Sequence, residues 1–164
     1  MKKILFSLIL LSSFVFGAVK DEGKVFKVEE VKALNDRINL LKEQTATDFE
    51  VVTLAEENEK VFSGLENATR KVIVVLQKGE ENSIKVKLAF SNDINLTGYE
   101  DKINKKLEEL ERVISPKTFS DYTLELLAET GDVLTSIQLD EKSAAEAKNG
   151  IDKNRNSRSG RQDN

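Results

Sequence analysis

The sequence predicts an α/β protein, a three-layer α/β/α sandwich built on a small mixed β-sheet with helices on both faces. Three observations carry this prediction. Residues 72–76 are five consecutive apolar residues, four of them β-branched, which is typical of a strand buried on both faces. Residues 49–70, before this strand, predict a further strand and a helix. Residues 83–90, after it, alternate between large apolar residues and residues that are polar or small, which is typical of a half-exposed strand. The buried strand therefore has neighbouring strands and the helices needed to cover it.

The N-terminal segment, residues 1–18, has the features of a secretory signal peptide. Lys2 and Lys3 precede an apolar run that ends at Phe16, and Gly17 and Ala18 follow. The run is shorter than the roughly 20 apolar residues that a membrane span needs. We expect cleavage after Gly17 or Ala18 and an exported protein, periplasmic or secreted, with no transmembrane helix after cleavage. The alternative is an uncleaved signal that tethers the domain to the outer face of the inner membrane.

The composition narrows the possible chemistry. The chain has no cysteine and no histidine, which excludes disulfides, thiolate metal sites, Ser-His-Asp and Cys-His hydrolases and imidazole-bound metals. A metal bound here would have oxygen ligands, which favours calcium or magnesium. Residues 19–140 hold 25 acidic against 17 basic residues, a net charge of −8. An acidic domain without a basic face is not expected to bind nucleic acid.

The first half of the domain alternates helix and strand. Residues 25–26 are interpreted as a short edge strand, and apolar residues at three- and four-residue steps predict a helix over residues 28–44. Residues 49–55 are rich in β-branched residues and predict a strand. Residues 56–70 carry apolar residues at helical spacing and predict a crossover helix, so the strands on either side of it are expected to be parallel.

The second half is predicted to be a hairpin and two helices. The alternating residues 83–90 form a strand antiparallel to residues 71–77, joined to it by a short turn. Residues 97–100, Thr-Gly-Tyr-Glu, match a capping box ahead of an amphipathic helix, and Pro116 ends that helix. A last helix is expected over residues 121–139. The domain therefore spans residues 19–140, and residues 141–164 are too poor in apolar residues to fold and are expected to be a disordered tail.

One candidate metal site lies between the hairpin and the following helix. Asn92, Asp93 and Asn95, with Glu100 and Asp101 nearby, offer the oxygen atoms that calcium prefers. The competing interpretation is that these residues form a turn through their own backbone hydrogen bonds, and a lone turn supplies too few ligands for calcium. A carboxylate set assembled from distant positions, such as Asp48, Asp93 and Asp132, also stays open.

Other charged groups have simpler interpretations. Lys85 and Lys87 could bind an anion, but lysines on an edge strand usually face solvent and discourage edge pairing. Glu56, Glu57 and Glu59 fit the first turn of the predicted crossover helix. The sequence therefore identifies no catalytic and no cofactor-binding residue, and the metal ligands, if any, stay unknown.

The order of elements over residues 25–139 resembles the TPM domain family, whose members include thylakoid-lumen phosphatase-like and photosystem-repair-like exported domains. The resemblance extends to Phe49–Leu54, Lys71–Leu76 and Ile114–Tyr122. It implies the family's α/β fold. The chain departs from the family at residues 24–28, 67–70 and 91–95, the loops where the resemblance would place metal binding and phosphatase activity.

We therefore expect a divergent TPM-like exported domain, soluble after cleavage, that serves as a non-catalytic binding or accessory module of the cell envelope. Its expected partner is another envelope or secreted protein. Two alternatives stay open: a divergent phosphatase that depends on a divalent metal, and a structural partner that docks on an envelope protein.

Overall fold

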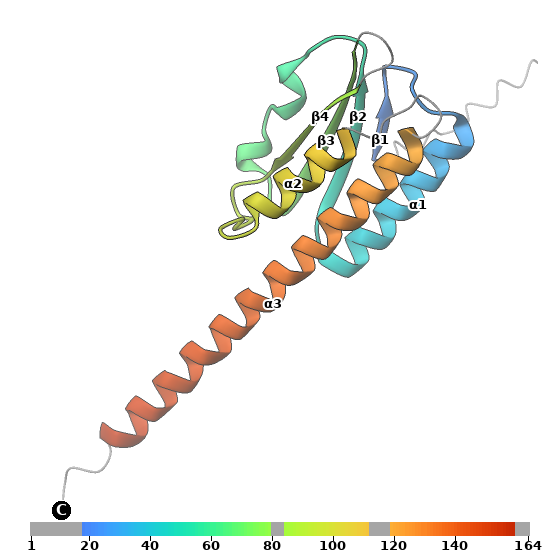
Figure 1. Cartoon of the computed structure of the whole chain (residues 1–164). Coiled ribbons are helices and arrows are strands. Elements are labelled where there is room, and N and C mark those ends of the chain that lie inside the picture. Colours follow the sequence, from blue (N-terminus) through green and yellow to red (C-terminus); the bar gives the residue numbers. More distant parts are fainter. Residues whose placement is uncertain (1–17, 80–83, 112–118, 160–164) are drawn as a thin grey trace, which may run out of the picture.

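A four-stranded sheet organises the chain, whose computed structural model describes residues 18–79, 84–111 and 119–159 (Figure 1). The strands are β1 (Val19–Asp21), β2 (Asp48–Leu54), β3 (Lys71–Lys78) and β4 (Ile84–Phe90), and they lie in the order β1-β2-β3-β4. β1, β2 and β3 are parallel, and β4 is antiparallel to β3. The predicted α/β class, the mixed sheet, the parallel pair and the hairpin are confirmed.

Three helices cover one face of this sheet: α1 (Val28–Thr45), α2 (Glu100–Glu111) and α3 (Phe119–Ser159) (Figure 1). Alternate residues of β2 and β3 point toward them, so Val51, Val72 and Val74 are completely buried. The apolar stripes of α1 and α3 complete this core with Leu34, Ile38, Leu41, Leu126, Leu127, Val133, Leu134 and Ile137. The side chain of Tyr122 is 5% exposed, as expected for a core anchor.

The other face, called the second face below, has a much thinner cover. The prediction of an α-helix over residues 56–70 is wrong: the chain forms two 3₁₀ helices, η1 (Glu59–Phe62) and η2 (Leu65–Asn67). Gly64 between them has a φ of +81°, a left-handed conformation that an α-helix cannot include. A small second core of Val52, Leu54, Leu65, Ile73 and Val75 lies beneath this segment.

The start of the domain also differs from the prediction. The edge strand is β1, residues 19–21, and not residues 25–26. The Asp21 carboxylate accepts hydrogen bonds from the backbone N–H groups of Val25 and Phe26 at 2.9 and 3.0 Å. These bonds turn the chain away from the sheet, so residues 25–26 connect β1 to α1.

The predicted capping box before α2 is not formed in its usual arrangement. In a capping box, Glu100 would be the third helical residue after the capping residue Thr97, but it is the first residue of α2. Its carboxylate accepts a hydrogen bond from the Gly98 N–H at 2.9 Å. The predicted break at Pro116 lies outside the described residues.

α3 is much longer than the predicted helix over residues 121–139. It continues to Ser159 and projects beyond the sheet (Figure 1). Residues 141–149 are all exposed, and they are helical, whereas the sequence predicts a disordered tail from residue 141. The segment is rich in alanine, glutamate and lysine and has no glycine or proline before Gly150, so its local propensity favours a helix.

Within the described ranges, no helix is both long and apolar enough to cross a membrane.

Candidate functional site: a polar groove on the second face

A groove of about 330 Å³ opens on the second face of the sheet, between β1 and the 3₁₀ segment. We call it the polar groove. Its floor is formed by strand residues, and its opposite wall comes from the crossover between β2 and β3. The lining residues are Lys20, Glu22, Glu50, Val52, Asn58, Lys60, Val61, Ser63 and Lys71.

The strand register explains why charged side chains meet on this floor. Lys20 pairs with Val52, and Glu50 pairs with Ile73, so all four side chains lie on the second face. Lys71, two residues before Ile73, lies on the same face. The 3₁₀ segment covers the apolar part of this face and leaves the charged part open.

Glu50 connects the two lysines of the floor. Its Oε1 lies 2.5 Å from Lys20 Nζ and its Oε2 lies 2.8 Å from Lys71 Nζ, while the Glu50 side chain is only 15% exposed. Burial acts to raise the pKa of Glu50, but the hydrogen bonds and charges of Lys20 and Lys71 outweigh it, and the pKa is lowered. Glu50 is therefore ionised at neutral pH and holds both ammonium groups in place.

The opposite wall presents neutral polar groups and one further cation. Asn58 caps η1 by accepting a hydrogen bond from the Lys60 backbone N–H at 3.1 Å. Ser63 contributes a hydroxyl group to the same wall. Among the described residues, the Lys60 ammonium group has no ion pair, in contrast to Lys20 and Lys71.

The groove has the size of a small-molecule site, and its one carboxylate with a shifted pKa has a lowered and not a raised pKa. Its volume lies at the lower end of the roughly 300–1,000 Å³ typical of small-molecule sites. A carboxylate that acts as general acid needs a raised pKa, whereas the pKa of Glu50 is lowered. The part of the chain that the structure describes also contains no group of three or more carboxylates able to hold a metal ion.

The structure places the predicted metal-site residues in a turn that uses their oxygens. Both oxygens of Asp93 accept from the Arg70 backbone N–H, at 3.0 and 2.9 Å, and its Oδ1 also accepts from the Ser91 hydroxyl at 2.6 Å. The hydrogen bond from Ser91 is the main cause of a lowered pKa of Asp93. Asp93 therefore ties the end of β4 to the start of β3.

The neighbours of Asp93 have similar local roles. Asn92 donates to the Glu66 carbonyl at 3.3 Å, and Asn95 Oδ1 accepts from the Thr97 N–H at 3.1 Å. Glu100 accepts a hydrogen bond from the Gly98 N–H, and Asp101 is exposed in the first turn of α2. These residues therefore fit the turn interpretation better than the metal interpretation.

The distant carboxylates do not form a metal-ligand group in the described structure. Asp48 forms an ion pair with Lys42 at 2.6 Å, and Asp132 is exposed on α3.

Lys85 and Lys87 lie on the second face at the far side of the 3₁₀ segment. Lys87 forms an ion pair with Glu57, which lowers the pKa of Glu57 and raises that of Lys87. This pair fastens the crossover to β4. The prediction that Glu56, Glu57 and Glu59 form the first turn of an α-helix is wrong, because the segment forms 3₁₀ helices instead.

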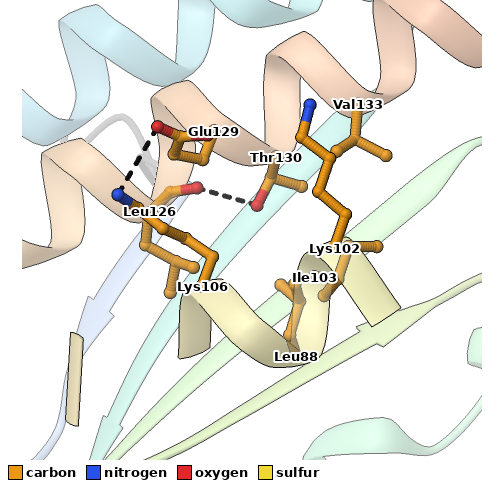
Figure 2. Close-up of a pocket in the computed structure, with 8 residues that line it drawn as sticks. All are labelled: Leu88, Lys102, Ile103, Lys106, Leu126, Glu129, Thr130 and Val133. Carbon is orange, nitrogen blue, oxygen red and sulfur yellow. Dashed lines mark hydrogen bonds and ion pairs between the residues drawn. The ribbon is translucent and has the colours of Figure 1, made fainter. Parts of the chain in front are cut away.

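A second hollow lies between α2, α3 and β4 (Figure 2). Lys106 crosses its rim to Glu125 at 2.9 Å and to Glu129 at 3.5 Å. Its volume of about 10 Å³ is close to that of a single water site, which is too small for a ligand.

Sequence reasoning did not single out the residues of the polar groove. One signal was available: Glu50 and Thr53 are the only polar residues within the strand-like stretch 49–54, and Glu50 is the only charged one. A charge inside such a stretch requires a partner, but the partners come from β1 and β3, whose registers the sequence does not specify.

Comparisons with known proteins identify no family. No family model matches the chain, and no curated protein matches it. Two solution NMR structures are similar. The first is the N-terminal domain of a protein from P. gingivalis, with a TM-score of 0.47 and 17% identity over 74% of this chain and 81% of that one. The second is the N-terminal domain of the cg2496 protein from Corynebacterium glutamicum, with a TM-score of 0.45 and 10% identity over 76% of this chain and 80% of that one. At these TM-scores the similarities carry no argument about function.

Proposed function

We propose that this chain is a divergent, TPM-like exported domain that acts as a non-catalytic binding module of the cell envelope, with the polar groove as its binding site. The observation that carries the proposal is the arrangement of Lys20, Glu50 and Lys71 at the floor of an open groove. Two cations fixed by a carboxylate are already ordered before a ligand arrives, and preordering reduces the entropy cost of binding.

The hydrogen bonds of the candidate metal ligand Asp93 support a binding role over a phosphatase role. Asp93, the best candidate for a metal ligand in the loop after β4, uses both oxygens to hold the Arg70 N–H. These contacts orient the Asp93 carboxylate toward the backbone at the start of β3, so binding a cation through it would compete with a hydrogen bond that contributes about 1 kcal/mol to stability.

Export is proposed from residues 1–18 alone. Pulse labelling of cells, followed by fractionation and N-terminal sequencing of the processed protein, tests it. We expect a shortened chain outside the cytoplasm that begins at Ala18 or Val19, whereas a full-length chain in the cytoplasm contradicts export. A start at Ala18 retains the carbonyl that accepts the Val51 N–H at 2.8 Å, so this start favours the folded sheet.

Thermal melts and a turnover assay on the chain from Ala18 to Asn164 distinguish the binding module from the metal-dependent phosphatase. We expect the same melting temperature in EDTA, calcium and magnesium, and no hydrolysis of a phosphate monoester. A metal that binds only the folded state raises the melting temperature by linkage. A shift with calcium or magnesium, together with hydrolysis that Asp93→Asn abolishes, would replace this proposal with the phosphatase.

A further inference from the structure

We propose that the polar groove binds a small oxyanion, a phosphate or carboxylate group, between Lys60 on its wall and the Lys20–Glu50–Lys71 cluster on its floor. The inference rests on the proposed binding function and names the class of ligand.

The charge of the groove is opposite to that of the domain. Three lysines and two glutamates line it, which gives a net charge of +1, whereas residues 19–140 together carry −8. An anion repelled by the rest of this surface therefore meets a locally favourable site. The attraction acts over a short range, since the screening length at physiological salt is about 8 Å.

Glu50 has the position of an internal anion. Each of its oxygens contacts one ammonium group, and each ammonium group carries three donors. Lys20 and Lys71 therefore keep donors that Glu50 does not use. Because Lys60 has no ion pair among the described residues, its ammonium group can approach a ligand from the opposite wall without breaking a contact.

The competing explanation is that the cluster only stabilises the sheet. The two explanations predict different effects of Glu50→Gln on anion binding. If Glu50 is an internal anion, Glu50→Gln removes the competing negative charge, an effect that we expect to outweigh the lost ordering of the two ammonium groups, so that binding of a phosphate tightens roughly three- to tenfold. If the cluster is purely structural, the substitution leaves anion binding unchanged.

The test is a titration of the ¹⁵N-labelled chain from Ala18 to Asn164 with inorganic phosphate, and separately with acetate, at low ionic strength. Chemical shifts of backbone amides report both the place and the dissociation constant of binding. We expect saturable shifts at residues 20, 50, 60 and 71. Lys60→Gln should weaken binding roughly three- to tenfold. The matched control Lys32→Gln, on an exposed position of α1 outside the groove, should stay within twofold.

The outcomes separate this inference from the proposed function. Binding of phosphate alone limits the ligand class to phosphates, and binding of acetate as well extends it to carboxylates; either supports the inference. Equal affinities in the wild type, Glu50→Gln and Lys60→Gln overturn it, as does a shift map centred elsewhere. If the groove responds to a neutral or cationic compound but to neither anion, the inference fails and the binding function stands.

Lys60 makes no ion pair within the described ranges, so Lys60→Gln is expected to fold even if Glu50→Gln does not.

Discussion

Replacing Gly131 by alanine is expected to destabilise the protein although alanine is the better helix former. Gly131 lies where α3 contacts α1, and a Cβ atom at this position would be 2.5 Å from Leu41 Cδ2. Leu41 is 2% exposed and packed in the core, so its methyl group can turn aside only against neighbouring side chains. Such overpacking costs about 1–3 kcal/mol, and the helix propensity of alanine offsets about 1 kcal/mol of it. The free energy of unfolding should therefore fall by about 1 kcal/mol.

Urea unfolding followed by circular dichroism measures this change, and a double-mutant cycle with Leu41→Ala identifies its cause. Leu41→Ala alone should cost about 2–5 kcal/mol because it leaves a cavity. Adding Gly131→Ala to that variant should then cost nothing or restore up to about 1 kcal/mol, because the clashing methyl group is gone. If Gly131→Ala is neutral when Leu41 is present, or equally harmful in both backgrounds, the contact between α1 and α3 is not as close as described.

Three further predictions concern the groove, the turn and the long helix. The pKa of Glu50 in the folded protein lies below its ordinary value of 4.5, so its ion pairs stabilise the protein above pH 4.5 and are lost as the pH falls toward the folded pKa. The difference in unfolding free energy between wild type and Glu50→Gln, measured with urea from pH 7 to pH 3, should therefore shrink below about pH 4.5. A difference that stays constant over this range would contradict the ion pairs. Asp93→Asn should lower the free energy of unfolding by about 0.5–1.5 kcal/mol, because an amide has one oxygen to accept hydrogen bonds from Arg70 and Ser91 where the carboxylate has two. The loss should be equal in EDTA and in calcium. A loss seen only in calcium would restore the metal interpretation. Ending the chain after Ser143 should reduce the helical ellipticity but leave the melting temperature within about 1 °C of that of the longer chain, because residues 144–149 are exposed. A drop of several degrees would reveal packing that the structure does not show.

Three of the four strands and the three helices could be predicted because their signals are local, whereas β1, only three residues long, carries no such signal. The apolar run at residues 72–76, the alternation over residues 84–90 and the stripe of α1 each report the face that is buried, independently of the rest of the chain. The last helix was recognised by the same signal as far as residue 139. Its extension lacks an apolar stripe, so only helix propensity marked it, and propensity alone is a weak predictor.

The crossover and the groove could not be predicted for a different reason. Residues 56–70 carry apolar residues at helical spacing, but Gly64 has a left-handed φ and the segment forms two 3₁₀ helices. The floor of the groove joins three strands. Lys20 and Lys71 meet Glu50 only because of the register between β1, β2 and β3, which becomes known when the sheet is assembled.

The most direct test of the account is one amide shift map of the chain from Ala18 to Asn164, recorded first with magnesium and then with phenyl phosphate added. We expect magnesium to leave the amide shifts of residues 91–101 unchanged, because Asp93, Asn95 and Glu100 hold backbone N–H groups. We expect the phosphate ester to shift the amides around Lys20, Glu50 and Lys60 and to be recovered intact. Magnesium-dependent shifts at residues 91–101, with hydrolysis of the ester, would contradict the binding function and place the active centre at the turn after β4.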